Sequence, residues 1–169
     1  MARNVEIKAR IAGWQEMRDR IEKIVRGPGE KLEQEDVFFS VPRGRVKVRT
    51  VNGKCELIYY FRENATHARE SNYLIIPVEN GARTREMLTA VHGEIGVVRK
   101  TRWLFMAGQT RIHLDQVEGL GDFLELEVVM REGQSAREGE TIAGALMAQL
   151  GVEPDQLLDR AYFDYLRAK

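Results

Sequence analysis

The chain has 169 residues, a length typical of one domain with a sizeable hydrophobic core. Hydrophobic residues make up 43% of the sequence and charged residues 31%, which argues against wholesale disorder. Lys and Arg together number 26, as do Asp and Glu, so the sequence lacks the basic surplus that bulk nucleic-acid binding usually requires.

Two further features bear on where such a protein resides. Cys55 is the single cysteine, so no intrachain disulfide can form, as is typical of proteins in a reducing cytosol. The N-terminal residues show no apolar signal sequence, and no stretch is long and apolar enough to span a bilayer. We therefore expect a cytoplasmic protein that does not contact membranes.

Hydrophobic periodicity predicts strands and one helix in the N-terminal part of the chain. Asn4–Ile11 alternates between polar and apolar residues, as a strand does, and Gly13–Arg26 has the apolar spacing of an amphipathic helix. Asn52-Gly53 is a strong signal for a two-residue hairpin turn. Further strands are predicted at residues Lys31–Ser40, Arg45–Val51 and Lys54–Arg62.

The C-terminal part begins with the polar stretch Glu63–Asn72, which is predicted to be a mobile loop. Strands are predicted at Tyr73–Val78, Val97–Met106, Thr110–Asp115 and Phe123–Arg131. Helices are predicted at Ala82–His92, Ser135–Leu150 and Arg160–Ala168. Seven or eight strands joined mostly as hairpins, with about four helices, indicate an α+β fold in a single domain over residues 1–169.

Charged residues recur on one face of the predicted strands, because neighbouring side chains of a strand point to opposite sides. On the first strand Glu6 and Lys8 share a face that is opposite Val5 and Ile7. At least six strands repeat this pattern. A solvent-facing sheet surface would explain any single strand. For the whole set we favour a barrel or deep cleft whose interior is charged and whose apolar exterior is covered by helices.

Charges at such density are costly to bury unless they are paired, hydrated or bound to a charged ligand. Arg and Lys side chains match phosphate oxygens, and carboxylates suit Mg²⁺ or Mn²⁺. The residues therefore predict a polyanionic ligand held by a basic set and a divalent metal held by an acidic set. The basic set is Lys8, Lys47, Arg49, Arg62, Lys100, Arg102 and Arg111, and the acidic set is Glu6, Asp115, Glu125 and Glu127.

Ordered blocks over nearly the whole chain resemble the CYTH family, the triphosphate tunnel metalloenzymes. Asn4-Val5-Glu6-Ile7-Lys8 resembles the family's Glu-x-Glu-x-Lys strand, with Asn4 in place of the first Glu. Lys100-Thr101-Arg102 resembles its Lys-x-Arg motif. The other resembling blocks are Gln34–Phe39, Gly44–Arg49, Leu57–Arg62, Ile112–Asp115, Leu120–Glu127 and Arg160–Leu166.

The resemblance implies a closed antiparallel tunnel barrel of about eight strands and metal-dependent chemistry on a triphosphate. The C-terminal block His113–Glu127 looks closest to class IV adenylyl cyclases, which implies conversion of ATP to cyclic AMP and pyrophosphate. Hydrolysis of tripolyphosphate or thiamine triphosphate is the alternative, and a non-catalytic polyphosphate-binding module is a third. The residues that the resemblance assigns to catalysis are Glu6, Lys8, Lys100 and Arg102, and a homodimer is a further expectation.

Two residues have two interpretations each. Asn4 either coordinates metal or phosphate through its neutral amide, or lies near the tunnel mouth with little effect. His113, on a strand beside Asp115, either assists proton transfer or is a hydrogen-bonded residue of the wall.

Overall fold

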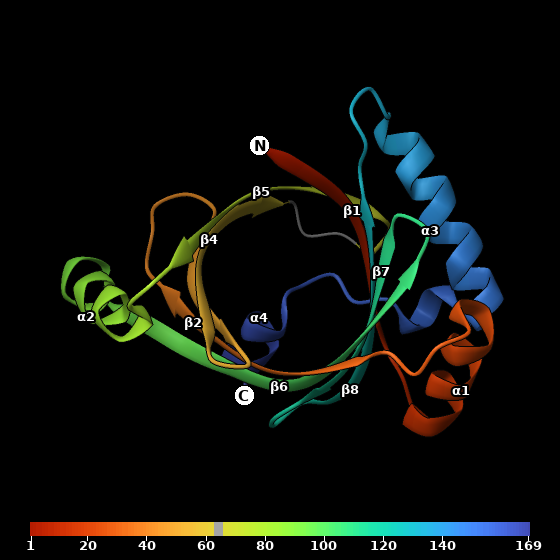
Figure 1. The fold of residues 1–169 in the computed structure, drawn as a ribbon, viewed down its shortest axis with the longest axis horizontal. Coiled ribbons are helices and arrows are strands. Elements are labelled where there is room, and N and C mark those ends of the chain that lie inside the picture. Colours follow the sequence, from red (N-terminus) through yellow and green to blue (C-terminus); the bar gives the residue numbers. More distant parts are fainter. Residues whose placement is uncertain (63–65) are drawn as a thin grey trace.

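The computed structural model describes residues 1–62 and 66–169. Within this part of the chain, eight antiparallel strands close into one barrel in the order β1-β5-β4-β3-β2-β6-β7-β8, with helices around it (Figure 1). The predicted α+β fold, a closed antiparallel barrel with helices packed outside, is confirmed. A barrel of eight strands is wide enough to hold one small ligand.

The structure assigns the following bounds to these elements. The strands are β1 (Ala2–Arg10), β2 (Glu30–Phe39), β3 (Arg45–Val51), β4 (Lys54–Arg62), β5 (Arg69–Val78), β6 (Glu94–Ala107), β7 (Thr110–Val117) and β8 (Gly121–Val129). The helices are α1 (Trp14–Val25), α2 (Gly81–His92), α3 (Ala136–Leu150) and α4 (Tyr162–Arg167), with a 3-10 turn at Pro154–Gln156. None of the helices in the described residues is long and apolar enough to cross a membrane.

The largest hydrophobic core lies between the outer surface of the barrel and the helices. Val5, Ile112 and Leu126 point outward from β1, β7 and β8 and are fully buried against Ile21 of α1 and Leu150 of α3. Figure 1 shows α1 and α3 together on this side of the barrel, whereas α2 lies on the opposite side. Because the apolar faces of the strands are buried outside, their charged faces line the interior.

Local signals in the sequence explain two of the boundaries. Asn52 and Gly53 both have positive φ angles, 46° and 81°, as the turn between β3 and β4 requires. Ser135 and Glu138 form the expected capping box at the start of α3.

The predicted loop at Glu63–Asn72 is wrong over its last four residues, since β5 begins at Arg69. Arg69 and Ser71 face the barrel interior and pair with β1, where Glu6 lies opposite Arg69 and Asn4 opposite Ser71. Residues 69–72 are polar on both faces of the strand, because Glu70 and Asn72 alternate with Arg69 and Ser71, so no apolar periodicity marks them as a strand. The rest of the predicted loop includes residues 63–65, which lie outside the described part of the chain.

Candidate active site

The barrel encloses a cavity of about 550 Å³ to which every strand contributes side chains. Ten of the eleven charged residues predicted for the site line this cavity. The exception is Asp115, which is completely buried behind the cavity surface. The ten lining residues are Glu6, Lys8, Lys47, Arg49, Arg62, Lys100, Arg102, Arg111, Glu125 and Glu127.

The C-terminal segment closes one end of the barrel, and α4 lies across this opening in Figure 1. Tyr162 and Phe163 are buried there against Phe38, Val98 and Phe123 of the surrounding strands. Phe163 stacks on Phe38 with ring centroids 4.6 Å apart. We call the buried cluster of Phe38, Val98, Val117, Phe123, Tyr162 and Phe163 the plug.

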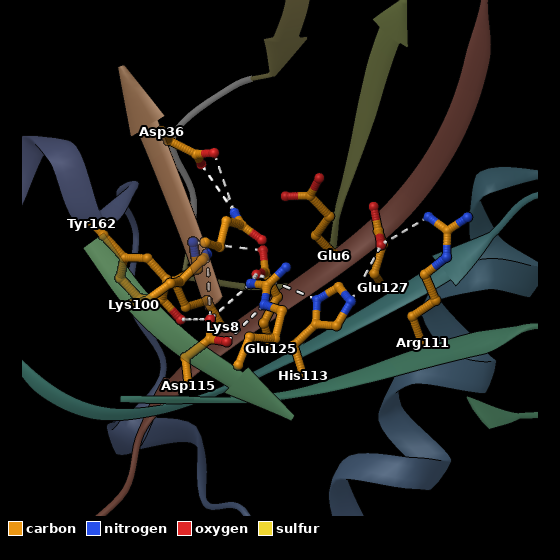
Figure 2. Close-up of polar contacts among 12 residues, drawn as sticks. Glu6, Lys8, Asp36, Lys100, Arg111, His113, Asp115, Glu125, Glu127 and Tyr162 are labelled. Carbon is orange, nitrogen blue, oxygen red and sulfur yellow. Dashed lines mark hydrogen bonds and ion pairs between the residues drawn. The ribbon is translucent and has the colours of Figure 1, made fainter. Parts of the chain in front are cut away.

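Three of the carboxylates that line the cavity share one pair of strands. Glu6 on β1 lies opposite Glu127 on β8, and Glu125 lies opposite Lys8 in the same ladder. Figure 2 shows these side chains pointing into the interior. We call Glu6, Glu125 and Glu127 the carboxylate wall.

Each member of the carboxylate wall contacts a cation in this structure. Arg62 Nη1 donates to Glu6 Oε2 at 2.7 Å, and Arg111 Nη1 donates to Glu127 Oε2 at 3.2 Å. Lys8 Nζ lies 3.5 Å from Glu125 Oε1. The carboxylates keep 13–18% side-chain exposure, so their free lone pairs face the cavity.

The second group of charges, the cation wall, comprises two Lys-x-Arg pairs, Lys47 with Arg49 on β3 and Lys100 with Arg102 on β6. Each pair contacts a buried aspartate on a neighbouring strand. Lys47 Nζ donates to Asp36 Oδ2 at 2.7 Å, and Arg49 donates to both oxygens of Asp36 at 2.8 and 3.1 Å.

The other half of the cation wall repeats this arrangement. Arg102 donates to the two oxygens of Asp115 at 2.6 and 2.7 Å, and Lys100 Nζ lies 3.5 Å from Asp115. Arg102 also donates to Glu125 at 2.8 Å, which connects the two walls. Bidentate pairing fixes the orientation of a guanidinium, so both arginines are held in place before any ligand binds.

Burial and charge alter the pKa values of these groups. Burial, opposed in part by Asp36, lowers the pKa of the Lys47 ammonium to about 7, and burial likewise lowers that of Lys8 to about 8. Burial alone would raise the pKa of Asp36, but the charges of Arg49 and Lys47 hold it well below its ordinary value. Burial would also raise the pKa of Glu125, but the charges of Lys8 and Arg102 keep it well below its usual range.

Two residues of the candidate site were not included in the sequence-based site prediction. Asp36 lies in a block that resembles the family. It is two residues after Gln34, so both side chains point to the same face of the strand and line the cavity. Strand parity could therefore have identified Asp36 as a residue of the site. Tyr162 also lies in a resembling block, Arg160–Leu166, but strand parity gave no signal for it, because its position depends on how the C-terminal segment folds back. Its hydroxyl donates to Asp115 Oδ2 at 2.9 Å.

The ring of Tyr162 also contacts the two lysines of the site that lie beside the plug. Lys8 Nζ lies 4.0 Å and Lys100 Nζ 4.9 Å from the ring centroid. Such distances are typical of cation–π contacts, which stabilise a buried ammonium group. Figure 2 shows Tyr162 beside Lys100 and Asp115.

Asn4 lines the cavity and is 1% exposed, so its side chain is buried inside the barrel. Its amide nitrogen donates to Glu127 Oε1. Its Oδ1 atom is buried and has no hydrogen-bond partner among residues 1–62 and 66–169. A buried oxygen without a donor is the kind of atom that a cation would satisfy.

His113 occupies the cavity wall between two carboxylates. Nδ1 is 3.7 Å from Glu125 and Nε2 is 3.9 Å from Glu127, both beyond hydrogen-bond distance. Burial, together with the charge of Arg102, lowers the pKa of the imidazole. His113 is therefore a buried, largely neutral wall residue, without the hydrogen bond that one of its two interpretations assumed.

The donors present fit a hard divalent cation, because the carboxylate wall and the free Asn4 oxygen supply only oxygen ligands. Among the residues that the structure describes, no three side chains of His, Cys, Asp or Glu form a complete metal site. The carboxylates are held by cations instead. A metal would therefore have to replace ion pairs such as Arg62 with Glu6.

Comparison with known proteins finds similar proteins over nearly the whole length of the chain. The family model for the CYTH domain matches residues 2–162. The PH1012 protein of Pyrococcus horikoshii OT3 is 25% identical, with a TM-score of 0.85 over 95% of this chain and 98% of that one. No curated protein sequence matches this chain.

Two other solved structures share the fold at lower identity. A Vibrio parahaemolyticus protein described as a "putative adenylate cyclase" is 19% identical, with a TM-score of 0.81 over 97% of both chains. A Hippeastrum "putative adenylyl cyclase", described as having a dominant triphosphatase activity, is 12% identical, with a TM-score of 0.69 over 99% of this chain and 96% of that one. From the family match over 2–162, this chain belongs to the CYTH domain family.

Proposed function

We propose that this protein is a metal-dependent enzyme that binds a triphosphate inside the barrel and catalyses transfer or cleavage at one of its phosphorus atoms. The observation that carries the proposal is the division of one buried cavity into a cation wall and a carboxylate wall. A polyanion and a divalent metal are the two ligands that such walls complement.

The residues of the chain divide the work as follows. Lys47, Arg49, Lys100 and Arg102, with Lys8, Arg62 and Arg111 from other strands, bind and orient the phosphate oxygens. Glu6, Glu125 and Glu127 hold the metal, with Asn4 Oδ1 as a neutral neighbour. When bound, the metal supplies Lewis-acid stabilisation of charge on the phosphoryl oxygens.

We place Asp115 differently from the other predicted metal ligands. Both of its oxygens already accept hydrogen bonds from Arg102, and one also accepts from Tyr162. Its role in this proposal is to hold Arg102 and Lys100 toward the substrate. Preorganised charge of this kind accounts for much of the rate enhancement in phosphoryl transfer.

Two reactions use this machinery. In the cyclase reaction the ribose 3′-hydroxyl of ATP attacks the α-phosphorus and pyrophosphate leaves, whereas in the hydrolase reaction water attacks the terminal phosphorus. The same charges serve both, since fold and charge arrangement underdetermine the substrate. A purely binding module would need the cation wall but has no use for three cavity-facing glutamates, which favours an enzyme.

Product analysis with ATP, tripolyphosphate and thiamine triphosphate tests the proposal, with Mg²⁺ and Mn²⁺ each supplied. Cyclic AMP with pyrophosphate supports the cyclase, and orthophosphate supports the hydrolase. Absence of both turnover and binding with all three would contradict the proposed function.

Variants of the two walls test the site. Lys8→Ala and Glu127→Ala are each expected to abolish activity while the protein stays folded, as checked by circular dichroism. Full metal-dependent turnover in either variant would rule out the assignment of that residue.

A further inference from the structure

Among the residues that the structure describes, four arginines line the cavity, and they are held in two ways. Arg49 and Arg102 each donate to both oxygens of a buried aspartate. Arg62 and Arg111 each donate through one nitrogen to one oxygen of a glutamate. Two parallel bonds restrict the rotation of a guanidinium more than one bond does. Arg49 and Arg102 are therefore fixed, whereas Arg62 and Arg111 can turn away from their partners.

The two single-contact pairs lie at the surface of the cavity. Glu6 and Glu127 keep 13% and 18% of their side chains exposed, and Arg111 keeps 39%. Figure 2 shows Arg111 extending from β7 toward Glu127 on β8. Both partners of each pair line the same cavity. Rotation of the arginine side chain would therefore be enough to bring its guanidinium from the glutamate to a ligand beside it.

These pairs join residues to which the proposed function gives different ligands. Arg62 and Arg111 bind phosphate oxygens in that proposal, and Glu6 and Glu127 hold the metal. In the ligand-free protein each arginine instead neutralises one of these glutamates. A metal that displaced the arginine would leave it without a counter-ion, and a phosphate that drew the arginine away would leave the glutamate without one. An unpaired charge inside a protein is costly, whereas the two ligands together compensate both partners of each pair.

We infer that Arg62 and Arg111 are exchangeable counter-ions. They neutralise Glu6 and Glu127 while the barrel is empty, and they turn to the phosphate oxygens when a triphosphate binds, which frees both glutamates for the metal. The inference rests on the proposed function and adds that each of the two ligands strengthens the binding of the other. Such coupling is reciprocal, because both ligands act on the same equilibrium between paired and separated charges.

The contacts of Glu127 show how a glutamate can lose its arginine and keep its place. Arg111 donates to Oε2, whereas the Asn4 amide donates to the other oxygen, Oε1. Departure of Arg111 therefore frees Oε2 while Asn4 still orients the carboxylate. Glu125 differs, because one of the fixed arginines, Arg102, donates to it at 2.8 Å. The exchange therefore excludes Glu125.

Removing an exchangeable arginine should improve metal binding to the ligand-free protein. Arg111→Gln frees Glu127 and is expected to lower the Kd of Mn²⁺, measured by calorimetry without any triphosphate, by roughly fivefold or more. Lys54 also lines the cavity, but it lies outside the ion pairs of the carboxylate wall. Lys54→Gln removes the same charge without freeing a glutamate, and its effect is expected to stay within about twofold because salt screens exposed charges.

The reverse experiment removes the glutamate and measures the anion. Glu127→Gln frees Arg111 and is expected to lower the Kd of tripolyphosphate, measured in metal-free buffer with EDTA, by roughly fivefold or more. Glu56 is a glutamate that lines the cavity outside the carboxylate wall. Glu56→Gln removes the same charge, and a smaller change is expected because no paired arginine is released.

The second pair allows the same comparison. Arg62→Gln is expected to strengthen Mn²⁺ binding, and Glu6→Gln is expected to strengthen tripolyphosphate binding in the absence of metal. Arg62 is buried, so circular dichroism checks that its variant folds. Arg111 is largely exposed, so its replacement is expected to leave the fold intact and the test does not depend on Arg62.

The outcomes separate the two proposals. If the unaltered protein binds Mn²⁺ and tripolyphosphate, but Arg111→Gln and Glu127→Gln bind them no more tightly than their control variants do, the exchange is wrong and the proposed function stands. Weaker Mn²⁺ binding by Arg111→Gln would also overturn the exchange. If the unaltered protein binds neither ligand at millimolar concentration, the proposed function fails and the exchange with it.

Discussion

The cation wall and the carboxylate wall contain similar numbers of charges but hold them differently. In the cation wall, Asp36 and Asp115 each accept several hydrogen bonds and have side-chain exposures of 4% and 0%. In the carboxylate wall, Glu6, Glu125 and Glu127 remain 13–18% exposed. The aspartates therefore anchor cations within the protein, whereas the glutamates are available to a ligand.

The largest effect is expected for Asp115→Ala, which removes an anchor. Arg102 would then keep only Glu125 as a counter-ion and Lys100 would lose its ion pair, and breaking such a buried pair costs about 3–5 kcal/mol. Urea unfolding measures the free energy of unfolding directly. Glu127→Gln is the matched change in the other wall, and a similar loss in both variants would show that the walls do not differ.

A smaller effect is expected for Tyr162→Phe, which keeps the ring beside Lys8 and Lys100 but removes the hydroxyl that donates to Asp115. A hydrogen bond to a charged group contributes about 1.5–3 kcal/mol to stability. Unfolding measurements test this loss, while tripolyphosphate affinity is expected to stay near that of the unaltered protein. No loss of stability would mean that Arg102 and Lys100 alone satisfy the aspartate.

Metal affinity tests the carboxylate wall directly. Glu127→Gln removes one negative ligand and is expected to weaken Mn²⁺ binding by roughly tenfold or more, because the affinity of a hard cation follows the charge of its ligands. Calorimetry with Mn²⁺ alone measures this without turnover. Glu132→Gln, in the exposed turn before α3, is the control, and equal Mn²⁺ affinity in all three proteins would exclude Glu127 as a ligand.

The smallest predicted effect is a change of tripolyphosphate affinity with pH, caused by the titration of Lys47 in the cation wall. With a pKa of about 7, Lys47 loses its charge as the pH rises above neutrality, so tripolyphosphate affinity should fall by up to about tenfold per pH unit through this group. Lys47→Arg keeps its charge throughout and should reduce the slope between pH 6 and 8. An identical slope in the variant would contradict the prediction.

The same shift affects the stability of the ligand-free protein. The folded pKa of Lys47, about 7, lies below the ordinary value of 10.5. Between these two pH values the unfolded chain binds more protons than the folded one. Lys47 therefore makes the protein more stable as the pH rises from about 7 to about 10.5.

Most of the barrel was predictable from the sequence because its signals are local. The alternation in Asn4–Ile11, the Asn52-Gly53 turn and the apolar spacing of Gly13–Arg26 each depend on a few neighbouring residues. Residues 69–72 show where this fails, since a strand segment with polar residues on both faces looks like a loop until its partners on β1 and β4 are known.

The sequence by itself determined which residues share a face of each strand, because strand parity separates Glu6, Lys47, Arg102 and Glu127 from their apolar neighbours wherever the strands lie. Only the tertiary structure decided how those charges pair. Asp36 and Asp115 became anchors, and Tyr162 joined the site, because strand order and the folding back of the C-terminal segment bring together residues that are far apart in the chain. Ion pairs and burial depend on the distances in space between these residues, and hydrophobic periodicity along the sequence does not give those distances.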